Sequence, residues 1–165
     1  MDIYLIRHGD SVELDYEIAI DGNRYLTPQG RNKTAEAAER LKELKTEFDV
    51  ILTSPLVRAV QTAEITASVL GYKGEIKTAS ELTPGSSFQK FLQLIKRNSS
   101  FKTIACFGHS PDVNVFCSGL LKSNAKDTKI DFKKSSVCKI DYDIKNESGN
   151  LIWFLNADKM ELIKI

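Results

Sequence analysis

This chain contains few histidines and few cysteines, and its net charge is close to zero. Its 165 residues include two histidines and three cysteines, and the formal net charge is +1. Because a general nucleic-acid binder carries a strong basic excess, no nucleic-acid partner is expected. No apolar stretch approaches the roughly 20 residues that a membrane span requires, and the N-terminus lacks the basic and apolar regions of a secretion signal. We therefore expect a soluble cytoplasmic protein with no membrane partner.

The three cysteines form no motif. Cys106, Cys117 and Cys138 are odd in number and widely spaced, and no C-x-x-C pair occurs among them. This spacing argues against both a disulfide framework and a zinc site. We interpret the cysteines as small buried apolar residues, and we expect neither a metal nor a cofactor.

Strand-like and helix-like patterns alternate along a chain that is long enough for one domain with its own core. Its composition, 42% hydrophobic and 27% charged, is ordinary for a globular protein. The alternation predicts a single α/β domain over residues 1–165, a three-layer α/β/α fold whose central sheet is mostly parallel with an antiparallel edge. The expected strands are 3–7, 49–53, 75–78 and 103–108, the expected helices are about 28–45, 55–70, 86–97 and 111–121, a hairpin pairs 136–142 with 150–155, and a lysine-rich polar loop covers 122–134.

Two of these helices begin at recognisable signals. Thr27 precedes Pro28, the arrangement of an N-cap followed by proline at the first helical position, and Ser54 precedes Pro55 in the same way. Arg58 then falls about one turn into the second helix. A guanidinium near the free amides of a helix N-terminus makes an anion clamp, and the alternative is a solvated arginine on an exposed face.

The two histidines occupy equivalent positions, since each ends an apolar run beside a glycine. One run is Ile3-Tyr4-Leu5-Ile6-Arg7-His8-Gly9, and the other is Thr103-Ile104-Ala105-Cys106-Phe107-Gly108-His109. Both runs have the pattern of strands, so both imidazoles would lie at strand ends, where open α/β sheets gather their ligands. The arrangement suggests a site, although a single histidine at a strand end is more often structural.

Three motifs, in this order, carry a resemblance to a known family. Arg7-His8-Gly9 follows a strand, Ser54-Pro55-Leu56-Val57-Arg58-Ala59-Val60-Gln61-Thr62-Ala63 opens a helix, and Gly108-His109-Ser110 follows a later strand. With Leu26-Thr27-Pro28-Gln29-Gly30 before the first helix, the sequence resembles the histidine phosphatase superfamily over nearly its whole length. The resemblance implies a phosphoglycerate mutase-like fold, here with connections too short for a cap domain. It also implies a phosphate pocket of Arg7, His8, Arg58 and His109, with His8 as the nucleophile that becomes transiently phosphorylated.

Physical chemistry supports each of these implied roles. A phosphoryl group in transfer carries charge on three oxygens, so catalysis depends on positioning and on cationic or hydrogen-bond donors around them. Arg7 and Arg58 offer planar forks suited to that shape. Nearby arginines lower the pKa of His8, which keeps one ring nitrogen free to attack in line. His109 can donate a hydrogen bond to the phosphoryl group from across the pocket.

The residue that would protonate the leaving group is open between two candidates. Glu81, in Ser80-Glu81-Leu82-Thr83-Pro84, lies where many members of the superfamily carry such an acid. Asp10, two residues after His8, competes for the role. For either residue, a solvated carboxylate is the alternative.

Four further residues are secondary candidates. Gly9 would let the backbone approach the phosphate closely, and Ser11 or Ser110 would add a hydroxyl donor, although ordinary turn chemistry explains all three equally well. Arg24 is a candidate for the mouth of the pocket.

Within the superfamily, the short length and several segments look like the SixA-type bacterial phosphohistidine phosphatases. These segments are Arg7-His8-Gly9-Asp10, Arg24-Tyr25-Leu26-Thr27, Glu81-Leu82-Thr83-Pro84 and Lys159-Met160-Glu161-Leu162. The resemblance implies a phosphorylated protein as partner, of the histidine phosphotransfer or sugar-transport phosphocarrier type, and we expect a monomer. An imidazole leaving group needs less acid assistance than an alkoxide, so an unassigned acid is tolerable.

Other functions remain open from the sequence. A low-specificity or small-molecule phosphomonoesterase would use the same four residues, and a phosphohistidine-binding module without turnover is a third reading. Phosphoglycerate mutase activity is disfavoured, because a bisphosphate intermediate requires a closed pocket. The loop after His8 is acidic, which disfavours a strongly anionic protein partner at low salt. Its carboxylates are Asp10, Glu13, Asp15, Glu17 and Asp21.

Overall fold

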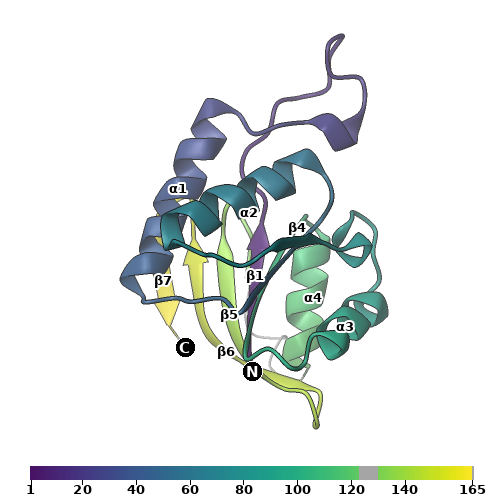
Figure 1. The fold of residues 1–165 in the computed structure, drawn as a ribbon, viewed down its shortest axis with the longest axis vertical. Helices are drawn as coiled ribbons and strands as arrows, with labels where there is room; N and C mark the ends of the chain where they lie inside the picture. Colours follow the sequence, from purple (N-terminus) through teal and green to yellow (C-terminus); the bar gives the residue numbers. More distant parts are fainter. Residues whose placement is uncertain (123–129, 165) are drawn as a thin grey trace.

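A computed structural model of the protein describes residues 1–122 and 130–164, and it contains a seven-stranded mixed sheet between two layers of helices (Figure 1). The strands are β1 (Asp2–Arg7), β2 (Val50–Thr53), β3 (Ile76–Thr78), β4 (Thr103–Gly108), β5 (Val137–Asp143), β6 (Ser148–Asn156) and β7 (Glu161–Lys164). The helices are α1 (Pro28–Glu43), α2 (Val57–Leu70), α3 (Phe88–Arg97) and α4 (Asp112–Leu121), with 3-10 turns η1 (Asp21–Asn23) and η2 (Ser80–Leu82). These elements confirm the predicted three-layer α/β/α fold.

The sheet joins a parallel half to an antiparallel half. Its strand order is β3-β2-β4-β1-β5-β6-β7, and the first four strands are parallel to one another. The last three strands run antiparallel to their neighbours, so this edge includes the predicted hairpin and one strand more. The extra strand, β7, was not predicted, because four mostly exposed residues with charges at both ends give no strand signal.

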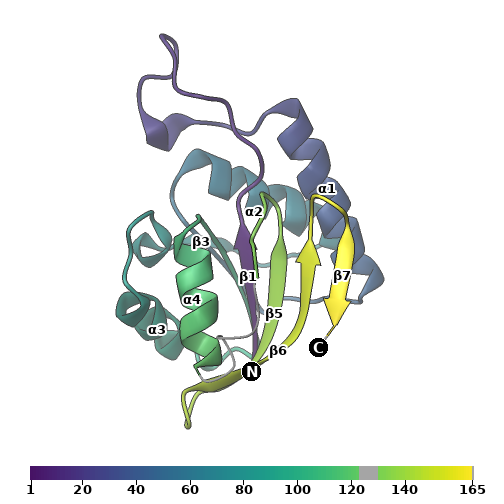
Figure 2. The ribbon, with the colours of Figure 1, turned by 180° about the vertical axis from the view of Figure 1, so that it is seen from behind.

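The core lies on both faces of the sheet, and β1 shows how. Ile3 and Leu5 pack with the side chains of α3 and α4, whereas Tyr4 and Ile6 pack with those of α1 and α2 on the opposite face. Successive side chains of a strand point to opposite faces, so an unbroken apolar run is what a strand covered on both sides requires. Figure 2 shows α3 and α4 on the face that lies behind the sheet in Figure 1.

The start of α1 fixes the segment that follows β1. Thr27 is the N-cap, with its Oγ1 accepting from the Gly30 amide at 2.9 Å, and Pro28 is the first helical residue, as predicted. A Cβ on Gly30 would lie 2.1 Å from the carbonyl oxygen of Asp10, and a Cβ on Gly9 would lie 2.6 Å from Thr34 Oγ1. Both glycines are therefore needed because helix and loop are pressed together here.

The start of α2 differs from the prediction. The helix begins at Val57, and its N-cap position is held by Leu56, which has no side-chain oxygen to offer. Ser54 is therefore not the N-cap, although its Oγ accepts from the Leu56 amide at 3.3 Å. The shift of two residues places Arg58 second in the helix, inside its first turn.

Three further expectations concern features away from the helix starts. Cys106, Cys117 and Cys138 are free and buried, as predicted. In the part of the chain that the structure describes, no helix combines the length and the apolar character needed to cross a bilayer. Residues 123–129 of the expected polar loop lie outside the described residues.

Candidate active site

The two histidines meet because their strands are neighbours in the sheet. β1 and β4 are parallel, and Arg7 pairs with Gly108, so His8 and His109 are the next residue of each strand. The His8 amide donates to the Gly108 carbonyl at 3.0 Å, and the centroids of the two imidazole rings lie 5.0 Å apart. Both side chains are buried. The structure thus brings together the two imidazoles that the sequence places at strand ends.

A single hydrogen bond sets the tautomer of His8. Its Nδ1 lies 2.7 Å from the carbonyl oxygen of Gly9, and a carbonyl can only accept. Nδ1 therefore carries the ring proton of the neutral imidazole, and Nε2 keeps a free lone pair. A nitrogen with a free lone pair is what a nucleophile needs.

Burial and positive charge keep both imidazoles neutral. Burial lowers the pKa of His8 to about 4; the hydrogen bond to the Gly9 carbonyl opposes this shift, and the charges of Arg58, Arg7 and Lys134 add to it. Burial also lowers the pKa of His109 to about 3, assisted by His8 and the two arginines. At neutral pH both rings are uncharged, so each retains one nitrogen without a proton.

These lowered pKa values predict a loss of stability in mild acid. Between pH 6.5 and pH 5 the unfolded histidines gain protons while the buried ones do not, so the free energy of unfolding should fall by about 1.5 kcal/mol per histidine. Urea denaturation at the two pH values measures this fall. A His8→Gln variant should show a smaller fall than the wild type, and an equal fall in the two proteins would contradict the assignment.

His109 presents a hydrogen-bond donor on the side of its ring away from Ser54. Its Nε2 lies 2.8 Å from Ser54 Oγ, which also accepts from the Leu56 amide. Among the described residues the Ser54 hydroxyl has no other acceptor, so it donates to Nε2 and the ring proton of His109 resides on Nδ1. That Nδ1 is buried and has no hydrogen-bond partner within the described part of the chain.

Each of the two arginines forms hydrogen bonds to the protein through the Nη atoms of its guanidinium group. Arg7 Nη1 donates to the Phe132 carbonyl at 2.7 Å, while Arg58 donates from Nη1 to the Asp21 carbonyl at 2.9 Å and from Nη2 to Asp21 Oδ2 at 3.0 Å. The Nε atoms of both arginines are buried and lack a partner among residues 1–122 and 130–164. Buried donors are normally satisfied, so these two and His109 Nδ1 are suited to an acceptor-rich ligand such as an oxyanion.

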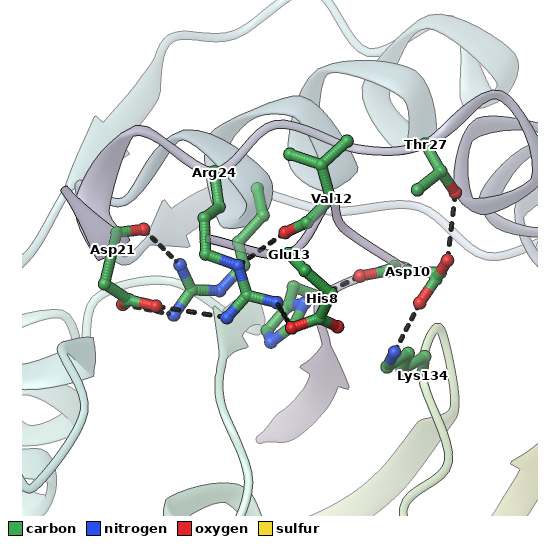
Figure 3. A network of polar contacts seen from close by, with 10 residues as sticks. His8, Asp10, Val12, Glu13, Asp21, Arg24, Thr27 and Lys134 are labelled. Atoms are coloured by element: carbon green, nitrogen blue, oxygen red, sulfur yellow. Dashed lines mark hydrogen bonds and ion pairs between the residues drawn. The ribbon is translucent and has the colours of Figure 1, made fainter. Parts of the chain in front are cut away.

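Arg24, the candidate for the pocket mouth, is bound within its own loop (Figure 3). Its Nε donates to the Val12 carbonyl at 2.6 Å, its Nη1 donates to Asp21 Oδ1 at 3.1 Å, and its Nη2 lies 3.5 Å from Glu13 Oε2. Burial alone would raise the pKa of Asp21, but its hydrogen bonds to Arg58 and Arg24 outweigh burial and lower it. Asp21 is therefore an ionised carboxylate that links Arg24 to Arg58.

Both candidate acids are ionised as well. Asp10 pairs with Lys134 and accepts from Thr27 Oγ1 at 3.0 Å, as Figure 3 shows, and chiefly the bond to Lys134 lowers its pKa. Glu81 lies in η2 and pairs with Arg97; burial would raise its pKa, but the contacts with Arg97 outweigh burial and lower it. A general acid at neutral pH needs a raised pKa, which is the opposite of what these two carboxyls have.

Comparison with known proteins now places the chain in a family. A family model described as the histidine phosphatase superfamily (branch 1) matches residues 3–83. An uncharacterized protein from a Picosynechococcus strain is 39% identical over 117 residues, which make up 68% of each chain. The chain belongs to the histidine phosphatase superfamily.

The similarity to SixA extends over the full length. The phosphohistidine phosphatase SixA of Escherichia coli K12 is 26% identical over 167 residues, with 99% of each chain covered. A solved structure of the protein histidine phosphatase SixA in complex with tungstate superposes with a TM-score of 0.87 at 26% identity, covering 98% of this chain and all of that one. The predicted resemblance is confirmed, and the chain is a phosphatase with a SixA-like fold.

Two residues of the superfamily motif, Gln61 and Thr62, have structural roles that the sequence analysis did not assign. Thr62 Oγ1 accepts from the Gly9 amide at 3.0 Å, and Gln61 Oε1 accepts from the Leu26 amide at 2.8 Å. Both residues follow Arg58 in the motif, so the signal was present. They join α2 to the two ends of the loop between β1 and α1, which fixes the histidine phosphatase site against that helix.

Ser11 and Ser110, the two candidates for a hydroxyl donor to the phosphate, differ in their surroundings. Ser11 Oγ is buried without a partner in the described part of the chain, whereas Ser110 Oγ donates to Asn114 Oδ1 at 3.2 Å. In this member of the superfamily, Ser110 is therefore already engaged by α4, and Ser11 has a hydroxyl available.

Proposed function

We propose that this single domain, residues 1–165, removes the phosphoryl group from phosphohistidine on a protein through a transient phosphohistidine on its own His8. The observation that carries the proposal is a neutral His8 with a free Nε2, together with three buried donors that lack partners among the described residues, while both candidate acids are ionised. This combination offers a nucleophile and an oxyanion site without a strong proton donor.

The four central residues take complementary roles in the proposal. His8 Nε2 attacks the phosphorus, and Arg7 and Arg58 neutralise the charge on the phosphoryl oxygens. His109 Nδ1 donates a hydrogen bond to an oxygen across the pocket. Gly9 orients the nucleophile through its carbonyl, and the Ser11 hydroxyl is available as a further donor.

The reaction then proceeds in two displacements. In the first, a P–N bond forms to His8 Nε2 while the P–N bond of the substrate breaks, and the substrate imidazole leaves. In the second, water attacks the phosphorus and the bond to His8 Nε2 breaks. Inorganic phosphate leaves with both protons of the water, and His8 is again the neutral imidazole with its proton on Nδ1. No metal or cofactor is needed to balance either step.

Phosphohistidine is a substrate whose leaving group does not need a proton from Asp10 or Glu81, which are both ionised. A phosphorylated imidazole can take a proton from water on its other ring nitrogen and so leave as a neutral molecule. An alkoxide leaving group has no such site and needs a proton from the enzyme. With Asp10 held by Lys134 and Glu81 held by Arg97, phosphohistidine is the easier substrate.

The relatives support the same proposal. SixA of Escherichia coli, similar over the full length, is named a phosphohistidine phosphatase. The SixA structure described above is a complex with tungstate, a tetrahedral oxyanion of the same shape as phosphate. We extend the proposal to a phosphorylated partner protein of the histidine phosphotransfer or sugar-transport phosphocarrier type.

The test is a comparison of substrates without added metal. We expect kcat/KM for a histidine phosphotransfer domain, or a sugar-transport phosphocarrier protein, phosphorylated on histidine to exceed that for p-nitrophenyl phosphate and sugar phosphates by at least about tenfold. Phosphate release measures each rate, with samples lacking enzyme as blanks. The reverse preference would favour a small-molecule phosphomonoesterase, and binding without any turnover would favour a phosphohistidine-binding module.

A further inference from the structure

The loop between β1 and α1, residues 12–25, exposes an unusual share of apolar side chains. Of the eight large hydrophobic residues that are exposed in the described part of the chain, four lie here: Leu14 at 52%, Tyr16 at 106%, Ile20 at 64% and Tyr25 at 44%. The other four are spread over the fold: Leu44 follows the end of α1, and Val115, Ile152 and Ile163 lie in α4, β6 and β7. Single exposed hydrophobic residues are ordinary, but four within twelve positions mark an interaction surface.

This loop is held beside the candidate active site. It projects from one end of the molecule, as both ribbon views show (Figures 1 and 2), and it begins four residues after His8. A β-bridge between Ser11 and Leu26 and a bond from the Val12 amide to the Tyr25 carbonyl close its base. Within the loop, Asp21 forms an ion pair with Arg58. A macromolecule with its phosphoryl group next to His8 therefore has this loop alongside it.

The charge of the loop selects among partners. It carries four carboxylates, at Glu13, Asp15, Glu17 and Asp21, against the one arginine Arg24. A second copy of the loop would bring like charges together, and anionic lipid headgroups and nucleic acid would be repelled. The complementary surface is an apolar protein patch bordered by lysine or arginine.

We propose that residues 12–25 form the docking surface for the phosphorylated protein, and that this partner presents an apolar patch with a basic border beside its phosphohistidine. The inference rests on the proposed function and adds how the substrate is recognised. Leu14, Tyr16 and Ile20 supply the apolar contact, and Asp15 and Glu17, both exposed, supply the charge complement. A small phosphorylated molecule enters the pocket without using this surface.

The first experiment uses a Leu14→Ser/Tyr16→Ser variant of the full chain, with Val115→Ser/Ile163→Ser as the matched control. Two probes are used, a histidine phosphotransfer domain phosphorylated on histidine and inorganic phosphoramidate, which contains the same P–N bond. The loop variant should lose at least about tenfold in kcat/KM for the phosphorylated domain and stay within about twofold of wild type for phosphoramidate. The control should match wild type on both probes.

A second variant tests the charge complement. Glu17→Lys should raise KM for the phosphorylated domain at low salt, and the difference from wild type should shrink as salt is added, because screening weakens charge pairs at exposed sites. Its rate with phosphoramidate should remain that of wild type. A KM equal to that of wild type at low salt would contradict the proposed basic border on the partner protein.

The outcomes separate this inference from the proposed function. If wild type dephosphorylates the domain and the loop variant does so equally well, the docking surface is wrong and the proposed function stands. If the loop variant loses both activities equally, the loop acts through the pocket and the docking surface is again wrong. If wild type hydrolyses phosphoramidate but does not act on phosphorylated proteins of either type, the proposed function fails and the docking surface fails with it.

Discussion

A His8→Ala variant should release phosphate roughly 10⁴-fold or more slowly than wild type, because it lacks the nitrogen that forms the new bond to phosphorus in the proposed mechanism. In wild type, the Gly9 carbonyl holds Nε2 free of its proton, and the low pKa of about 4 keeps the ring neutral. Phosphate release from phosphoramidate measures the loss. Rapid acid-free quenching followed by mass spectrometry of the wild type should find a phosphoryl group on His8.

The matched control for this result is His109→Ala. That variant loses a hydrogen-bond donor but keeps the nucleophile, so it should still become phosphorylated on His8, at a lower rate. Thermal unfolding of both variants checks that the fold is retained. A His8→Ala enzyme that keeps more than a few per cent of wild-type activity, or a phosphoryl group found on His109 in wild type, would contradict the assignment.

An Arg58→Ala variant should lose about 10²- to 10³-fold in kcat/KM, because it removes the fork of donors that we propose for the phosphoryl oxygens. Arg58→Lys should recover only part of this loss, since an ammonium keeps the charge but not the planar pair of donors. Steady-state kinetics with phosphoramidate provides the measurement. Because phosphoramidate needs no docking surface, the result concerns the pocket alone.

Arg40→Ala is the matched control for Arg58. Arg40 lies on α1, exposed, and pairs with Glu43 three residues away. Surface pairs of this kind contribute little, so its removal should leave kcat/KM within about twofold of wild type. An Arg58→Lys variant with full activity, or an equal loss in the Arg40 variant, would show that the guanidinium of Arg58 has no special role.

The part of the site that lies at the ends of β1 and β4 could be predicted from the sequence. The runs that end at His8 and His109 are apolar at every core position, and parallel neighbours in an α/β sheet place their carboxyl ends together. Thr27 and Pro28 likewise mark the start of α1 by local chemistry alone. The apolar runs and the start of α1 depend on neighbours in sequence, so a single chain reveals them. The pairing of β1 with β4 joins residues about 100 positions apart and is seen only in the structure.

The contacts that the loops contribute to the site could not be predicted in the same way. The bond between Asp21 and Arg58 joins residues that are 37 positions apart, and the loop that carries Asp21 has no periodic pattern. Ser54 was mistaken for an N-cap because a serine before a proline has the same sequence signature whether it caps a helix or contacts a buried histidine. The pairing of Asp10 with Lys134, across 124 positions, is equally invisible to local reasoning.

The register of β1 against β4 separates the parts of this enzyme that tolerate a change of length from those that do not. Deleting one residue from either strand would turn its apolar side chains to the opposite face and shift one histidine out of step with the other, so core and site would be lost together. The loop of residues 12–25 has no strand register to keep, and it is held at its closed base and at Asp21, which binds Arg58. A change of length on either side of Asp21 would therefore leave the spacing of the two imidazoles unchanged, because that spacing depends only on the pairing of β1 with β4.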